Sequence, residues 1–415
     1  MSKVKLGEVC DFINGGAWSD KEYSISGLPV LKVSNCKNSG FELDEIDYLP
    51  YELEEKYRSN RLKKGDVIIA TVGSHPNLKE SAAGRSSIVN SMVEGFYLNQ
   101  NAVCVRTKNK NVLDQGYIGY LSKYYIFTHY IQMRGKGAAN QMRIAIGAIK
   151  DYELDLPSIQ DQRKIDHALS SFDDLIENNQ KQIKLLEEAA QRLYKEWFVD
   201  LHFPGHEDTE IVDGVPEGWK KIPLGNVLQV VRGRSYSSKE LSDKEGVLMV
   251  NLSNIRPYGG YNRDQEKHYT GKVNDNQYVE THDLLMGVTD MTQERRTVGR
   301  VAIVPNLHAK AMISMDLIKL VPVAGSPLFY YALLNYGGYS EVISRFANGT
   351  NVLHLRPDVL RIIDVLLPSL EIQMQFVNQL EPIQRKIEAL QDESILAVEA
   401  RDRLLPKLMS GEIEV

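Results

Sequence analysis

The sequence predicts an α+β protein with two mostly β domains, separated by a long antiparallel two-helix coiled coil and related by an internal pseudo-twofold repeat. Two observations support this prediction. A Leu-Pro-Ser segment opens a long stretch of periodic apolar residues at residue 156, and the same segment opens another at residue 367. Short blocks rich in β-branched residues precede both stretches and recur in the same order, which is typical of strands joined by turns.

The repeated blocks define a first domain at residues 1–157 and a second at residues 223–368. The matched blocks are Asn14–Glu22 with Arg232–Glu240, Val30–Asn35 with Met249–Asn254, Gly65–Ile68 with His282–Leu285, and Gly84–Val89 with Gly299–Val304. Gly, Asn and Ser bound these blocks, as expected of turns. Near the end of each domain, Leu121–Met133 and Phe329–Phe346 have a more helical character. Each domain is therefore expected to have a β core with a few helices.

The coiled-coil helices are predicted at residues 158–200 and 369–412, with a linker at residues 201–222. Ser158 and Ser369 are plausible N-caps, and Ser158 with Asp161 resembles a capping box. Apolar positions alternate in steps of four and three, which is heptad spacing. The matched seam positions are Ile165, Leu169, Phe172, Ile176, Ile183, Leu186, Ala190, Leu193 and Trp197 in the first helix, and Phe376, Leu380, Ile383, Ile387, Ser394, Ala397, Arg401, Leu404 and Leu408 in the second.

The polar seam residue Asn179 indicates the direction of pairing. An antiparallel pair places Asn179 opposite Ser394, whereas a parallel pair places it opposite Leu390. The antiparallel pair leaves fewer polar groups unsatisfied, so we expect it, with Asn179 and Ser394 setting the register. The alternative is a rod that pairs with another chain. Pro406 is expected to kink or end the second helix, leaving Leu408–Glu412 as a tail.

Charge is distributed unevenly along this chain of net charge −6. Residues 1–156 hold 20 Lys and Arg against 18 Asp and Glu, and residues 224–370 hold 16 against 14. The helical segments carry the acidic excess, so slightly basic domains remain compatible with a nucleic-acid partner. The chain shows no apolar run long enough for a membrane span and no signal-peptide pattern, and its three cysteines form no motif. We expect a cytoplasmic protein with no membrane partner.

Catalytic motifs are not evident in the sequence. It has no phosphate-binding G-x-x-x-x-G-K-[ST] loop and no Pro-Pro dipeptide of the kind that amino-methyltransferases use. His202 and His206 are four apart, but Phe203-Pro204-Gly205 breaks the helix that would align them as metal ligands. The cysteines Cys10, Cys36 and Cys104 are expected to be small buried hydrophobes. The chain itself is therefore expected to have no catalytic residue, metal or bound cofactor.

Two glycine-rich loops combine amides with cations, at Arg134–Arg143 and Arg345–His354. Gly allows backbone N–H groups to approach phosphate, Asn and Gln can pair with adenine, and Arg can pair with guanine. The alternative is that both loops are ordinary turns before an exit strand. Arg295 and Arg296 could contact a base or a phosphate, and a solvated pair is an equally good interpretation. The full set of candidate DNA-binding residues is Trp18, Lys32, Arg85, Arg134, Lys136, Asn140, Gln141, Arg143, Arg232, Arg234, Tyr236, Arg295, Arg296, Arg300, Asn348, Thr350, Asn351 and His354.

Several short motifs, weak singly but specific in this order, together resemble the specificity subunit of a type I restriction–modification system. They are Asp155-Leu156-Pro157 before the first helix, Leu193–Asp200, Phe203-Pro204-Gly205, Gly214–Trp219 and Leu404–Ile413. The resemblance covers essentially the whole chain. It implies two target-recognition domains that each read one half of a bipartite, asymmetric double-stranded DNA target, with the coiled coil setting the spacer.

The resemblance also implies partners. Two modification (methyltransferase) subunits would dock on this chain, and restriction (motor–nuclease) subunits would complete the complex. S-adenosylmethionine, ATP and Mg²⁺ would belong to those partners. Matched positions differ between the domains: Asn14 corresponds to Arg232, Gly16 to Arg234 and Arg143 to His354, so different half-sites are expected. A coiled-coil scaffold without its own DNA recognition, and a self-contained methyltransferase or nuclease, are the alternatives.

Overall fold

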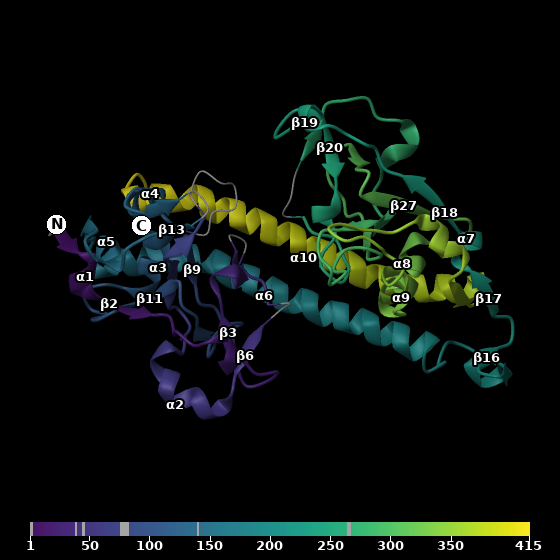
Figure 1. The fold of residues 1–415 in the computed structure, drawn as a ribbon, viewed down its shortest axis with the longest axis horizontal. Helices are drawn as coiled ribbons and strands as arrows, with labels where there is room; N and C mark the ends of the chain where they lie inside the picture. The colour runs from purple at the N-terminus through teal and green to yellow at the C-terminus, as the bar shows by residue number, and fades with distance from the viewer. Residues whose placement is uncertain (1–2, 38–39, 44–45, 75–82, 139–140, 264–266) are drawn as a thin grey trace. The chain divides into compact units, whose positions relative to one another are not determined.

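The computed structural model describes residues 3–37, 40–43, 46–74, 83–138, 141–263 and 267–415. The chain forms two units, of which unit 1 comprises residues 1–179 and 393–415, and unit 2 comprises residues 180–392. Two long helices, α6 (Ile159–Phe198) and α10 (Leu370–Ser410), each contribute one segment to unit 1 and one to unit 2. Figure 1 shows the strands and short helices of each unit beside these segments.

Unit 1 is built around an antiparallel four-stranded sheet. Its strand order is β2 (Cys10–Asn14), β11 (Ala102–Thr107), β7 (Val67–Ala70) and β9 (Ser86–Ile88). The other strands are β10 (Tyr97–Leu98), β3 (Leu28–Leu31) and β6 (Asp47–Leu49) in one sheet, β12 (Lys136–Ala138), β13 (Gln141–Arg143) and β8 (Val72–Gly73) in another, and the pairs β1 (Lys3–Lys5) with β14 (Glu153–Asp155) and β4 (Cys36–Lys37) with β5 (Gly40–Phe41). The helices are α1 (Leu6–Val9), α2 (Glu54–Tyr57), α3 (Gln115–Lys123), α4 (Tyr125–Gln132) and α5 (Ile146–Lys150).

Unit 2 repeats this plan. Its four-stranded sheet has the order β18 (Leu228–Arg232), β27 (Leu317–Pro322), β23 (Leu284–Gly287) and β25 (Val301–Ile303). A second sheet has the order β19 (Leu241–Ser242), β21 (His268–Tyr269), β20 (Val247–Val250), β26 (Ala311–Ile313) and β22 (Tyr278–Val279). The remaining strands form two-stranded pairs: β24 (Thr289–Asp290) with β28 (Leu353–His354), β17 (Lys220–Pro223) with β29 (Asp364–Leu367), and β15 (Ile211–Val212) with β16 (Val215–Pro216). The helices are α7 (Leu224–Val227), α8 (Pro327–Tyr336) and α9 (Tyr339–Ser344).

One glycine in each unit shows that the repeat is structural. A Cβ atom on Gly15 would lie 1.9 Å from the carbonyl oxygen of Asn99, and one on Gly233 would lie 1.9 Å from that of Ser314. Both glycines follow the first strand of the four-stranded sheet and press against the turn before the second strand. Only a residue without a Cβ allows this approach, which accounts for a glycine at the matched position.

Within each unit, the segments of the two long helices pair in antiparallel fashion, which confirms the predicted fold class (Figure 1). In unit 1, Asn179 Nδ2 lies 3.3 Å from Ser394 Oγ and 2.9 Å from Glu393 Oε2. In unit 2, the rings of Trp197 and Phe376 lie 5.7 Å apart. These pairs lie equal numbers of residues along the two helices in opposite directions, so both units use one register. The pairing is intramolecular.

The predicted N-caps are confirmed. Ser158 Oγ accepts from the Asp161 backbone N–H at 3.2 Å, and Ser369 Oγ accepts from that of Ile372 at 3.3 Å. The prediction of a C-terminal tail after Pro406 is wrong, because α10 continues to Ser410 and Leu408 is buried. A proline so near the end costs one backbone hydrogen bond, and the apolar packing of Leu408 offsets that loss.

Sequence reasoning missed a buried glutamine that follows the cap in each long helix. Gln162 Nε2 donates to the Pro157 carbonyl at 3.0 Å, and Gln373 Nε2 donates to the Pro368 carbonyl at 3.0 Å. The two glutamines occupy matched positions of the ungapped repeat, five residues after the prolines, so their recurrence was visible in the sequence. Each ties the start of its helix to the strand exit that precedes it.

Candidate nucleic-acid interface

The candidate loops of unit 2 meet at one edge of the four-stranded sheet. β18 and β23 both pair antiparallel with β27, so the ends of β18 and β23 lie beside the start of β27. The segment after β23 is tied to the turn before β27, since Val288 N–H donates to the Asp316 carbonyl at 2.9 Å and Thr289 Oγ1 to Asp316 Oδ1 at 3.0 Å. This edge therefore gathers segments that are far apart in the chain.

Asp290 organises the loop that follows β24. Its buried carboxylate accepts hydrogen bonds from the backbone N–H groups of Thr292 at 2.8 Å, Thr297 at 2.6 Å and Val298 at 3.2 Å, and from both threonine hydroxyls. Burial alone would raise the pKa of Asp290, but the hydrogen bonds from Thr297 and Thr292 outweigh it and hold the pKa below its ordinary value. The loop at residues 291–296 is thus fixed at its base.

The second glycine-rich loop lies against this fixed loop. β28 pairs with β24, and Gln293 Nε2 donates to the Thr350 carbonyl at 3.1 Å. Asn348 and His354 close the turn through backbone hydrogen bonds of 3.1 and 2.9 Å. The predicted residues Asn348, Thr350, Asn351 and His354 are all exposed here. Four donor- or acceptor-bearing side chains therefore face solvent from one ordered turn.

Arg295 and Arg296 are half-buried, and Arg300 is buried beneath them. Arg300 pairs with Glu341 at 2.5 Å, and its Nε donates to the Arg295 carbonyl at 3.4 Å. The Arg296 carbonyl accepts from the Tyr258 N–H at 2.8 Å. The structure thus gives Arg300 a supporting position behind the loop.

Arg232 ends β18 and is exposed at the same edge. Arg234 follows it, half-buried, with its backbone N–H on the Ile313 carbonyl at 2.9 Å and its Nε 3.5 Å from the Tyr269 hydroxyl. Tyr236 packs partly against a small core cluster. The two arginines are brought to the edge occupied by the loops after β23.

Unit 1 has the same convergence. Gly15 N–H donates to the Ala102 carbonyl at 2.9 Å, and Thr71 N–H donates to the Asn101 carbonyl at 2.8 Å. The β12–β13 hairpin is held at the same edge because β13 pairs with β8, the strand that follows Thr71. Lys136, Gln141 and Arg143 are exposed on this hairpin, whereas Asn140 lies outside the described residues.

Three candidates of unit 1 are engaged within the domain. Trp18 is buried with its ring 5.0 Å from that of Tyr57. Lys32 pairs with Asp47 and lies 4.8 Å above the Tyr23 ring. Arg85 Nη1 donates to the Cys36 carbonyl at 2.6 Å. Their contact with DNA stays a prediction, and the structure supplies each with a partner in its own unit.

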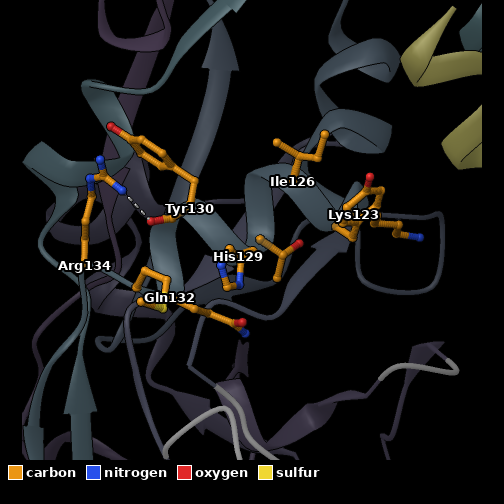
Figure 2. Close-up of a pocket in the computed structure, with 9 residues that line it drawn as sticks. Lys123, Ile126, His129, Tyr130, Gln132 and Arg134 are labelled. Carbon is orange, nitrogen blue, oxygen red and sulfur yellow. Dashed lines mark hydrogen bonds between the residues drawn. The ribbon is translucent and has the colours of Figure 1, made fainter.

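Arg134 lies beside a hollow of about 980 Å³ formed over α4. Its guanidinium stacks 3.5 Å from the centre of the Tyr130 ring and donates to the Tyr130 carbonyl at 3.1 Å (Figure 2). Lys123 and His129 also line the hollow, and none of the described residues that line it is acidic. The hollow thus combines the stacked Arg134 guanidinium with the exposed apolar and aromatic side chains of Tyr125, Ile126 and Met133.

Sequence reasoning missed the turn before the second strand of each four-stranded sheet. In unit 1 this turn is Asn99-Gln100-Asn101, and in unit 2 it is Ser314-Met315-Asp316. Gly16 bridges to Asn99 and Arg234 bridges to Ser314, so the two turns are equivalent. Gln100 and Met315 are both exposed at the edge. No local motif marks them, because only strand pairing brings them to the loops.

The described part of the chain contains no group of three His, Cys, Asp or Glu side chains placed to hold a metal ion. Burial raises the pKa of the Cys10 and Cys104 thiols to about 12 and that of Cys36 to about 11, which keeps them protonated.

Among the described residues, no helix is both long and apolar enough to cross a membrane.

Comparison with known proteins agrees with this geometry. The family model described as "Type I restriction modification DNA specificity domain" matches residues 1–188 and again 216–400. The MjaX type I restriction enzyme specificity subunit of Methanocaldococcus jannaschii is 25% identical over 99% of this chain and 93% of its own length. The HindI specificity subunit of Haemophilus influenzae is 20% identical over 92% of each chain.

A solved structure shares the fold. The S subunit of a type I restriction–modification system from M. genitalium superposes with a TM-score of 0.57 at 16% identity, covering 98% of this chain and 95% of that one. The family model matches both halves of the chain, each of which ends in one of the paired helices. The chain therefore belongs to the family of type I restriction–modification DNA specificity subunits.

Proposed function

We propose that each unit reads one half of a bipartite, asymmetric DNA target through the loops at the edge of its four-stranded sheet. The observation that carries the proposal is the convergence, in both units, of a glycine turn, a glycine-rich hairpin and exposed Arg, Asn or Gln side chains. Such side chains read base edges, while backbone and cationic groups position the phosphates. The paired segments of α6 and α10 act as the spacer, because each domain packs on its own segment.

We further propose that the chain is non-catalytic and acts in the cytoplasm with two modification subunits and with restriction subunits. S-adenosylmethionine, ATP and Mg²⁺ then bind those partners. The support is family membership, since a DNA specificity domain is matched twice along the chain. The mass of the purified complex measured by native mass spectrometry tests the stoichiometry, and a complex with a single modification subunit contradicts it.

Methylome sequencing of cells that express the chain with its modification subunit tests the reading of DNA. We expect one methylated motif with two different halves around an unread spacer, absent when the chain is omitted. Arg143→Ala in unit 1 should relax one half only, and Arg232→Ala in unit 2 should relax the other, by about tenfold per contacted base pair.

A matched control is available on the opposite side of unit 2. Arg361 is exposed near α7, which precedes β18 and so lies at the far end of that strand from Arg232. Arg361→Ala should leave the motif unchanged. A palindromic motif, or relaxation of the same half by both edge variants, contradicts the proposal.

A further inference from the structure

Two exposed methionines of unit 2 lie at the edge of the four-stranded sheet where the end of β18, the loops after β23 and the turn before β27 meet, which is named the reading edge after its proposed function. Met291, in the loop after β24, is 78% exposed, and Met315, in the turn before β27, is 49% exposed. Single exposed apolar residues are common on protein surfaces. These two, however, occupy adjoining turns among arginines, amides and hydroxyls, and each keeps about half or more of its surface exposed.

The backbone beneath both methionines is held in place. Asp290, next to Met291, accepts the hydrogen bonds from Thr292, Thr297 and Val298. Asp316, next to Met315, accepts from Thr289 Oγ1 at 3.0 Å. The two turns are therefore joined to each other as well as to the sheet. Because the turn is already fixed, its backbone loses little entropy on binding, so a side chain presented from it suits a specific contact.

The equivalent turn of unit 1 has different chemistry. Gln100 stands where unit 2 has Met315, and Asn99 and Asn101 flank it. An amide forms paired hydrogen bonds with adenine, whereas an apolar side chain in the major groove contacts the 5-methyl group of thymine. The same platform thus carries an amide surface in one unit and an apolar surface in the other.

We propose that Met291 and Met315 contact thymine 5-methyl groups in the half-site that unit 2 reads. The inference rests on the proposed function, and it assigns a chemical class of base to one of the two halves. Met is flexible and polarizable, so it can follow the methyl surface of one or two adjacent thymines. The neighbouring Arg232 and Asn351 remain free to read polar base edges.

Deoxyuridine tests this proposal at the level of one methyl group. The complex of the chain with its modification subunit is titrated with target duplexes in which the thymines of one half-site are replaced by deoxyuridine, one thymine per duplex. Loss of a buried methyl should weaken binding of the wild-type complex about fourfold at one or two positions. The Met291→Ala/Met315→Ala complex should bind the thymine duplex more weakly and no longer distinguish it from the deoxyuridine duplex.

Controls separate this inference from the proposed function. Met374→Ala removes a methionine on α10 that is 46% exposed, close to the 49% of Met315, and the variant should retain the fourfold discrimination. Deoxyuridine in the other half-site should affect the wild-type and double-variant complexes equally. A wild-type complex that binds no specific sequence contradicts the proposed function itself.

Several outcomes overturn the inference alone. The first is specific binding that does not change when deoxyuridine replaces thymine in either half-site. The second is that the half-site relaxed by the double variant contains no thymine. The third is that the double variant discriminates thymine from deoxyuridine as well as the wild type does. Weaker assembly with the modification subunit, with thymine discrimination kept, would assign the methionines to a protein contact instead.

Discussion

The two units anchor their domains to the helix pair with different chemistry. In unit 2, the rings of Phe198 on α6 and Phe376 on α10 lie 4.8 Å apart, and Phe329 of the domain lies 5.7 Å from Phe198. In unit 1, the buried Arg401 pairs with Asp173, which also accepts from the Tyr120 hydroxyl at 2.7 Å. One anchor is an aromatic cluster and the other includes a charged network.

The repeat makes this contrast a residue-by-residue one. At matched positions, unit 1 has Ile165 and Asp166 where unit 2 has Phe376 and Val377, and unit 1 has Arg401 where unit 2 has Ala190. The helix register is the same in both units, but the side chains that fill it are not. A shared backbone geometry therefore tolerates either apolar or charged anchoring, provided each buried charge has a partner.

The largest effect is expected for Phe376→Ala. Removing the ring leaves a cavity in the aromatic cluster of unit 2, so the free energy of unfolding should fall by about 3–5 kcal/mol. Phe376→Ile, which copies the residue of unit 1, should cost about half as much. Urea unfolding followed by tryptophan fluorescence measures both, since Trp197 belongs to the cluster. A loss below about 1 kcal/mol for the alanine variant would contradict the conclusion that the aromatic cluster anchors the domain of unit 2.

The charged anchor of unit 1 should respond next most strongly. Arg401→Met leaves the Asp173 carboxylate without its guanidinium partner, so the free energy of unfolding should fall by about 2–3 kcal/mol after allowance for the partial exposure of Asp173. Arg401→Met with Asp173→Leu should recover most of that loss. If the double variant is as unstable as the single one, apolar anchoring does not suit unit 1.

Asp166 should have the smallest effect and a defined pH dependence. Burial, followed by repulsion from Asp114, raises its pKa to about 6; Asp173 and Asp174 also raise it, and His167 opposes them. A carboxyl whose pKa is raised by folding binds its proton more tightly in the folded state, so its ionisation destabilises the fold as pH rises from about 4 to 6.

Asp166→Asn removes that ionisation. The variant should match wild type near pH 4 and exceed it by about 1 kcal/mol above pH 6, a value reduced for solvent screening. Thermal unfolding midpoints at pH 4 and pH 8 measure the difference. A variant that gains equally at both pH values would show that shape, rather than charge, distinguishes Asp166 from Val377.

Local patterns predicted the parts of the fold that depend on local interactions. The heptad steps predicted both long helices, Ser158 and Ser369 predicted their N-caps, and Asn179 with Ser394 predicted the antiparallel direction. The candidate loops were visible because Gly, amides and cations cluster along the chain. The prediction that Pro406 ends the second helix was wrong, because the effect of a proline depends on how much apolar surface is buried beyond it.

Sequence alone determined that this protein is a repeat of two β-rich domains on an antiparallel helix pair, because heptads, caps and matched blocks are encoded within short stretches of chain. Tertiary structure alone decided which loops meet. The turns bearing Gln100 and Met315 reach the reading edge only because β11 and β27 occupy the second place in their sheets. Strands of two to six residues carry too little pattern to specify non-local pairing, which packing of the whole domain selects.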